Sequence, residues 1–181
     1  MLYDEILLMR NMSYLDKNEE QSKEVIQYII EYLIYGDKHD SSIFDVFCEF
    51  NIMNEFIYLA NLNHRSINLQ IIKSFSVLIL NLSNTTTLYY IFSNNFINQI
   101  ISNDYEKYDD DFLSYYVNFI KSLSLKIDTT TIQFFYHKQL NSFPLVQSAM
   151  KLYNHTDPMI KNVVRNIILT VLKSNLFFIF S

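Results

Sequence analysis

Four histidines and one cysteine are the side chains of this sequence best suited to metal binding or nucleophilic catalysis. None of His39, His64, His137 and His155 is spaced from another histidine, a cysteine or a carboxylate so as to build a ligand set on one helix. Structural zinc takes four protein ligands and catalytic zinc usually three. Cys48 has apolar neighbours and no basic flanking group that would lower its pKa. The sequence therefore predicts no metal or cofactor and a buried, unreactive thiol.

Two of the histidines, His39 and His155, stand close to aspartates. This pattern is typical of turns in which Asp caps a helix and His is solvated. A run of carboxylates at Asp104, Glu106 and 109–111 lacks the oxygen spacing and the turn glycine of a calcium loop. We expect this run to form a charged loop that caps the helix after it.

The scarcity of glycine excludes several classes of enzyme. P-loops and dinucleotide fingerprints need several glycines where the backbone approaches phosphate, and Gly36 is the one glycine of the chain. No G-x-S-x-G nucleophile elbow is present. The net charge is −5 and no cluster of Lys and Arg occurs, which argues against nucleic-acid binding. The residues predict a non-enzymatic interaction module without a small-molecule substrate.

Four long apolar segments with helical spacing organise the chain. They begin near Glu19, Ser66, Asp109 and Asp157, at intervals of 47, 43 and 48 residues. Armadillo and HEAT repeats have periods of about 40–47 residues. Pairs of shorter apolar runs separate the long segments, at 43–50 and 53–60, at 86–92 and 96–101, and at 132–137 and 145–153. The pattern predicts an all-α fold, an armadillo/HEAT-like right-handed helical solenoid that forms a single domain over residues 1–181.

The first long segment stops where a helix–helix corner is expected. Gly36 stands at the position where a left-handed residue commonly ends a helix. We expect Gly36, Asp37, Asp40, Ser41 and Ser42 to form this corner, with Asp40 or Ser41 capping the next helix. If φ is positive at Gly36, its replacement by valine lowers the free energy of unfolding by about 1 kcal/mol or more.

The same corner carries a family resemblance. The segment GDKHDSSIFD at 36–45 resembles the G-D-x-x-D-S-S-[VI]-F-D pattern of the FPL-domain family, which includes the animal endosomal maturation (Ema) proteins and related plant trafficking proteins. Further blocks follow in the family's order: LYYIFSNNF at 88–96, YYV at 115–117 before SLSLK and FFY, and FPL at 143–145 before NH and VR. The resemblance marks these family-signature residues, which we expect to be mostly structural: Gly36, Asp37, Asp40, Ser41, Ser42, Phe44, Asp45, Tyr89, Tyr90, Ser93, Asn94, Asn95, Tyr115, Tyr116, Phe143, Pro144, Leu145 and Arg165.

The resemblance implies a cytoplasmic scaffold or adaptor that acts peripherally on endosome, lysosome or Golgi membranes and in autophagy, including mitophagy. It implies vesicle-tethering partners of the class C Vps/HOPS type, with membrane association through such partners. For some animal members it implies a RING ubiquitin ligase, so an accessory role in ubiquitin ligation is one alternative. A generic armadillo peptide-binding adaptor is another. Family members are usually longer, so the resemblance also implies that residues 1–181 are an N-terminal part of a longer protein, with a lone domain as the alternative.

Neither end of the chain carries a recognisable targeting or membrane signal. Asp4 and Glu5 stand where a signal peptide has its basic region. The apolar segment at 163–180 is interrupted by Arg165, Lys173 and polar residues. It is therefore short of the about 20 predominantly apolar residues that a helix needs to cross a bilayer. We expect no membrane span in this sequence.

Overall fold

The computed structural model describes residues 2–137 and 141–179. Helices and turns make up these residues, and their one β-type pairing is an isolated bridge between His137 and Ser142. The all-α class is therefore confirmed, whereas the right-handed solenoid stays a prediction. No helix within 2–137 and 141–179 combines the length and apolarity needed to cross a membrane. The chain divides into two compact units, unit 1 at residues 1–91 and unit 2 at residues 92–181. The single domain stays a prediction.

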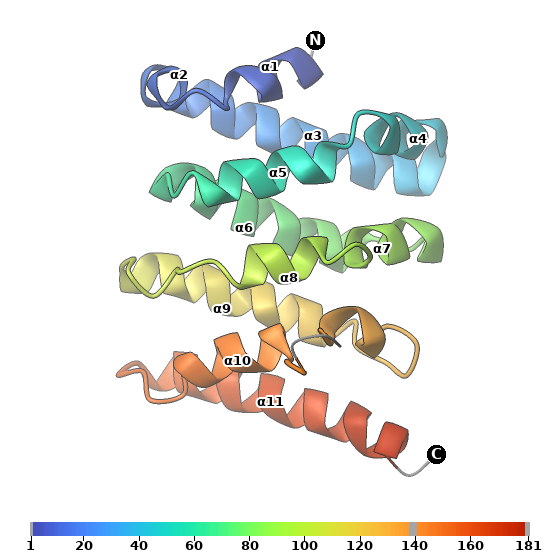
Figure 1. Cartoon of the computed structure of the whole chain (residues 1–181), viewed down its shortest axis with the longest axis vertical. Coiled ribbons are helices and arrows are strands. Elements are labelled where there is room, and N and C mark those ends of the chain that lie inside the picture. The colour runs from blue at the N-terminus through green and yellow to red at the C-terminus, as the bar shows by residue number, and fades with distance from the viewer. Residues whose placement is uncertain (1, 138–140, 180–181) are drawn as a thin grey trace. The chain divides into compact units, whose positions relative to one another are not determined.

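Unit 1 is organised around the long helices α3 (Glu19–His39) and α6 (Arg65–Asn81), which pack against each other (Figure 1). The shorter helices of this unit are α1 (Leu2–Leu8), α2 (Met12–Lys17), α4 (Ser42–Glu49), α5 (Ile52–Asn61) and α7 (Thr85–Phe92), whose last residue belongs to unit 2. Phe56 and Phe75 meet edge to face in the core, with ring centroids 5.2 Å apart and both side chains fully buried. Burial of such apolar surface is the main term that stabilises the helix packing.

Unit 2 pairs α9 (Asp110–Ser124) with α11 (Pro158–Ile179). Its other elements are α8 (Phe96–Ile101), the 3₁₀ helix η1 (Ile132–Phe135) and α10 (Pro144–Lys151). The buried ring of Tyr105 contacts Phe112 and Tyr116, with centroids 5.2 and 4.9 Å away. Aromatic rings of the loop before α9 and of α9 itself therefore fill much of this core.

The four long helices begin within one residue of the expected positions. Asp109 caps α9 by accepting a hydrogen bond from the backbone N–H of Phe112 at 3.0 Å. Pro158 begins α11, and Asp157 accepts from the N–H of Met159 at 2.7 Å. The shorter runs are helical as expected, except that the run at 132–137 forms only η1 before the bridge. The sequence pattern did not predict helices α1 and α2, which lie before the first predicted segment.

The prediction for Gly36 is wrong. Helix α3 continues to His39, and none of the residues with positive φ in the described chain is a glycine. Asparagine occupies these left-handed positions, where φ lies between 46° and 62°: Asn51, Asn63, Asn94, Asn95 and Asn141. Asparagine tolerates left-handed φ because its short polar side chain can bond locally to the backbone. Glycine is therefore not needed at the turns, and the role of Gly36 is a different one.

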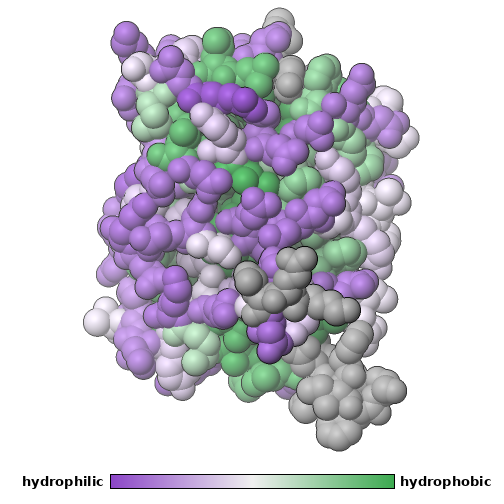
Figure 2. Space-filling model, in the orientation of Figure 1, coloured by the Kyte–Doolittle hydropathy of each residue, from purple (hydrophilic) through white to green (hydrophobic). Residues whose placement is uncertain are grey.

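Half of the residues in this chain are hydrophobic, and some of the large ones remain at the surface. Figure 2 shows hydrophobic residues among hydrophilic ones on the face that it presents. The exposed large side chains include Tyr28, Tyr32 and Tyr35 on α3, Val46 on α4 and Phe50 at its C-terminal end. Contiguous exposed apolar patches often mark interaction sites.

Candidate functional site

The corner between α3 and α4 contains the largest block of family-signature residues. Helix α3 ends at His39 and α4 begins at Ser42, so the chain turns at Asp40 and Ser41, whereas Gly36 and Asp37, which were expected in this corner, lie inside α3. One oxygen of Asp40, Oδ1, accepts from the backbone N–H of Ser42 at 3.0 Å and from its hydroxyl at 2.7 Å. These bonds hold the pKa of Asp40 below its ordinary value. Asp40 therefore caps α4 as expected, while the Ser41 side chain makes no capping bond.

Gly36 lies buried inside α3, where the helix passes close to α4. A Cβ atom at this position would lie 2.7 Å from Cβ and 3.0 Å from Cγ2 of Ile43. Cβ moves with the backbone, so the contact cannot be relieved by a side-chain rotation. Gly36 is required for the close approach of two helices, which is a second established use of glycine.

Asp37 connects α3 to the loop between α6 and α7. Its Oδ2 atom accepts hydrogen bonds from the backbone N–H groups of Ser83 at 2.8 Å and Asn84 at 3.1 Å, and from the Ser83 hydroxyl at 3.2 Å. Partial burial opposes ionisation, but these bonds and one from Thr87 hold the pKa of Asp37 below its ordinary value. The carboxylate of Asp37 thus caps the backbone N–H groups just before α7, in a segment 46 residues further along the sequence.

Replacing Asp37 by alanine is expected to lower the free energy of unfolding by about 1 kcal/mol at neutral pH, because two backbone N–H groups lose their acceptor and the site is only partly buried. The folded pKa is depressed, so the stabilisation is complete above the unfolded pKa and is lost as the pH falls through the folded pKa. The difference between wild type and Asp37→Ala should shrink between about pH 7 and about pH 3 in urea unfolding. Asp104→Asn, at an exposed site, is the matched control. A difference that is constant over this pH range would contradict this role for Asp37.

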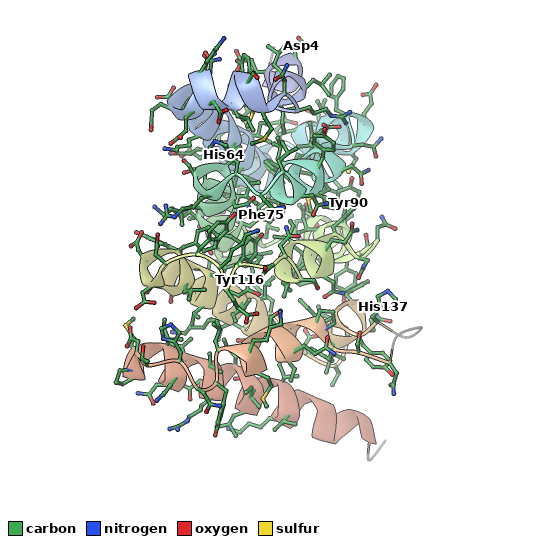
Figure 3. The ribbon with its side chains drawn as sticks, turned by 60° about the vertical axis from the view of Figure 1, so that its left-hand side comes forward. Asp4, His64, Phe75, Tyr90, Tyr116 and His137 are labelled. Carbon is green, nitrogen blue, oxygen red and sulfur yellow. The ribbon has the colours of Figure 1, made fainter. Side chains whose placement is uncertain are left out.

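Phe44 and Phe47 of α4 pack edge-on against the ring of Tyr90 on α7, with centroids 5.4 and 6.4 Å away. Figure 3 labels Tyr90. Burial raises the pKa of Tyr90 to about 12. Burial also raises the pKa of Cys48, against the opposing effect of its hydrogen bond with Tyr90. The thiol is therefore protonated at neutral pH and lacks the thiolate character that a nucleophile needs.

The remaining signature residues of the first block and of α7 have less distinct environments. Asp45 is exposed in the first turn of α4, where a carboxylate suits the helix dipole. Tyr89 is half-buried on α7. The corner residues therefore form internal contacts of unit 1, and an exposed acidic side chain remains beside them.

An apolar groove opens next to the corner, between α3 and α4. It has a volume of about 560 Å³ and is lined mainly by hydrophobic side chains of these two helices, with Asp4 of α1 and Ile52 of α5 at its borders. Val46 is 49% exposed and Tyr32 58% exposed. The groove was missed in the sequence because positions that line a groove have the same residue types as positions in a core.

In unit 2 the signature turn Ser93–Asn95 connects α7 to α8, and both of its asparagines are left-handed. The amide nitrogen of buried Asn98 donates to Oδ1 of Asn95 at 3.0 Å and to the carbonyl oxygen of Phe134 at 2.8 Å. The turn, η1 and His137 line an open depression of about 360 Å³. The asparagine amide therefore stabilises the link between this turn and η1.

The other signature residues of unit 2 also have structural surroundings. The Tyr116 hydroxyl donates to the carbonyl oxygen of Ile101 at 2.8 Å, and burial raises the pKa of Tyr116. Tyr115 is 38% exposed. The FPL tripeptide begins α10, with Phe143 at the N-cap, Pro144 in the first turn and Leu145 fully buried. The Arg165 guanidinium lies 5.7 Å from the ring centroid of Tyr153.

His64 and His155 accept backbone hydrogen bonds at the start of a helix and in a loop. Nδ1 of His64 accepts from the N–H of Ile67 at 3.5 Å as the N-cap of α6, and Nε2 lies 3.4 Å from Oδ1 of Asp16. His155 accepts from the N–H of Asp157 at 3.1 Å, and its Nε2 lies 3.4 Å from Asp110. His155 is therefore a packed side chain and not a solvated one, which corrects the expectation. Sequence reasoning missed the cap at His64 because histidine is not among the usual N-cap residues.

The described carboxylates of the acidic run in unit 2 do not converge on a common point where a cation could bind. Glu106 forms an ion pair with Lys151 at 2.8 Å, and Asp109 caps α9 as described above. Within 2–137 and 141–179 no group of three or more His, Cys, Asp or Glu side chains is arranged to hold a metal ion. Of the side chains that the sequence singled out for chemistry, Glu106, Asp109, His64 and His155 are thus engaged in ion pairs or in hydrogen bonds to the backbone.

Comparison with known proteins identifies the family. A model of the FPL family, described as an uncharacterised conserved protein, matches residues 26–172, a range that contains every signature residue. The chain belongs to the FPL family. Protein CLEC16A of Mus musculus is 37% identical over 174 residues, which cover 94% of this chain and 16% of that protein. No solved structure matches this FPL chain.

Other species contain relatives of this FPL chain as well. The CLEC16A homolog of Drosophila melanogaster is 37% identical over 170 residues, covering 92% of this chain and 16% of the relative. TRANSPARENT TESTA 9 of Arabidopsis thaliana is 30% identical over 160 residues, covering 86% of this chain and 19% of the relative. The chain therefore spans about one-sixth to one-fifth of the length of these relatives, and the FPL resemblance seen in the sequence is confirmed.

Proposed function

We propose that this FPL chain is a non-enzymatic scaffold or adaptor in endosomal, lysosomal or Golgi trafficking and in autophagy. The observation that carries the proposal is the match to the FPL family over residues 26–172, together with the trafficking role that the family resemblance implies. In this proposal the protein is cytoplasmic and reaches membranes peripherally, through vesicle-tethering complexes of the class C Vps/HOPS type.

The contacts of the signature residues support a scaffold. Asp37, Asp40 and Tyr116 direct their polar atoms to hydrogen-bond partners within their own unit. Such contacts are expected of residues that maintain the fold beneath a binding surface. The recurrence of long helices at about repeat spacing supports, in addition, a single right-handed armadillo-like solenoid, the architecture that binds partners over extended surfaces.

Affinity purification of the tagged protein from the cells that express it tests this function. We expect components of a class C Vps/HOPS-type tether to be enriched over a tagged, unrelated helical protein of similar size. Enrichment of a RING ubiquitin ligase without a tether would favour the accessory role in ubiquitin ligation. Recovery of soluble metabolic enzymes alone, with neither tether nor ligase, would refute the trafficking function.

A further inference from the structure

The apolar groove of unit 1 continues into a row of exposed tyrosines on α3. Tyr28, Tyr32 and Tyr35 are 49%, 58% and 57% exposed and follow each other at i, i+4 and i+7. They line a second depression, of about 330 Å³, together with Glu31. Tyr32 lines both depressions, so the two form one surface. We call it the α3–α4 docking surface.

The side chains of this surface suit protein recognition. Tyrosine combines a large apolar ring with little conformational freedom and is enriched among residues that dominate binding energies. Val46 and Phe50, 49% and 40% exposed, extend the apolar area along α4. The ring of Tyr35 lies tilted against the ring of His39 with centroids 4.7 Å apart, and this contact restrains the end of the tyrosine row.

The charge of the surface is negative. Asp4 lines the groove and Glu31 lines the tyrosine depression, and no Lys, Arg or His is among the described residues that line either. The exposed Asp45 and Glu49 flank Val46 and Phe50 along α4. Unit 1 as a whole contains 12 Asp and Glu against six Lys and Arg. A partner with positive charge beside its apolar face would be attracted and oriented by this field.

The same charge argues against other occupants. A second copy of this chain would bring one acidic surface against another, and anionic lipid headgroups would be repelled in the same way. Strand addition needs an open sheet edge, which no described residue of unit 1 supplies. The row of tyrosines is about 10 Å long at the rise of an α-helix, and its spacing matches that of an apolar helical stripe.

We propose that the α3–α4 docking surface binds an amphipathic α-helix of a protein partner, with the helix's apolar stripe in the groove and on the tyrosines and with Lys or Arg along its borders. This inference rests on the proposed adaptor function and specifies the class of partner segment. The aromatic and aliphatic side chains provide the affinity, and the carboxylates select the basic helix and set its association rate.

The probe is a fluorescent, helix-forming peptide of about 20 residues with a leucine stripe and lysine borders, titrated with the 181-residue protein. Its two counterparts have glutamate borders or the same composition in scrambled order. We expect the basic helix to bind at least about tenfold tighter than either counterpart, with affinity that falls as salt rises. Equal binding of the basic and acidic helices, or of the scrambled peptide, would overturn the proposal.

Variants locate the bound peptide. Val46→Arg places a cation in the groove and should weaken binding of the basic helix at least about tenfold, and Tyr32→Ala removes a ring from the centre of the surface and should weaken it severalfold. Leu80→Arg, at a position 55% exposed on α6, is the matched control and should change affinity less than about twofold. Circular dichroism checks that all three variants are folded. Equal losses in Leu80→Arg and Val46→Arg would contradict this location.

Two further outcomes have clear meanings. A wild-type dimer that Val46→Arg dissociates, or binding to anionic vesicles that Val46→Arg abolishes, would replace the helix by another occupant and overturn the proposal. If Val46→Arg leaves tether recovery in cells unchanged, the docking inference fails while the adaptor function stands. If the peptide binds as expected but no trafficking protein is recovered, the docking surface stands and the proposed function fails.

Discussion

Replacing Gly36 by valine is expected to lower the free energy of unfolding by about 3 kcal/mol, the upper part of the range for overpacking a tight contact. The new Cβ would lie 2.7 Å from Cβ of Ile43, so α3 and α4 must separate. The better helix propensity of the new residue recovers less than about 1 kcal/mol. Chemical denaturation monitored by circular dichroism measures the change. Valine at this site with wild-type stability would contradict the close approach of the two helices.

Alanine and asparagine at position 36 separate the helical contact from the left-handed turn that the sequence suggested. In a left-handed turn asparagine would be the best-tolerated replacement, because this chain already has asparagine at left-handed positions such as Asn94 and Asn95. In a helix against Ile43, alanine should be the least harmful residue and asparagine worse, because asparagine is larger and a poorer helix former. The order glycine, alanine, asparagine, valine from most to least stable is therefore expected.

Replacing Arg10 by alanine is expected to lower the free energy of unfolding by about 2–3 kcal/mol, below the usual range for a fully buried pair because Arg10 is half exposed. Arg10 donates from Nε and Nη2 to the two carboxylate oxygens of Glu55, at 2.8 and 2.6 Å. Glu55 is only 5% exposed, so its charge would be left buried without this partner. Thermal and urea unfolding measure the loss.

Two matched variants identify the cause of that loss. Lysine at position 10 cannot reproduce the two-pronged contact and should fall between wild type and alanine. Adding Glu55→Gln to Arg10→Ala should restore part of the stability, because a buried amide costs less than a buried carboxylate. Lys23→Ala breaks exposed pairs with Glu19 and Glu20 and should change stability by less than about 1 kcal/mol. If Lys23→Ala and Arg10→Ala cost the same, burial of Glu55 does not determine the effect.

Helix positions were well predicted because two independent signals coincided. Apolar side chains recur at helical spacing, and Asp109 and Asp157 with Pro158 mark the N-termini of α9 and α11 where the structure places them. Helices α1 and α2 were not predicted, since each is too short to show a clear period. Their attachment depends instead on contacts such as Arg10 with Glu55, which join segments 45 residues apart in the sequence.

The candidate site was predictable in part. The signature at 36–45 located the corner and the cap at Asp40, because a helix end has local sequence signals. The function of Gly36 and Asp37 depends on Ile43 and on the loop at Ser83, and no local pattern records which distant segment comes close. The same limit applies to the docking surface, where Tyr32 and Val46 resemble core residues until their exposure is known.

Proximity labelling in the protein's own cells tests the central claim, a scaffold that works at trafficking membranes, most directly. A labelling enzyme fused to the chain should mark class C Vps/HOPS-type tethers and proteins of endosomes, lysosomes or the Golgi above an untargeted control enzyme. Leu80→Arg should give the wild-type pattern, while Val46→Arg at equal abundance should lose the tether. A labelling pattern that is indistinguishable from the untargeted control would contradict the claim.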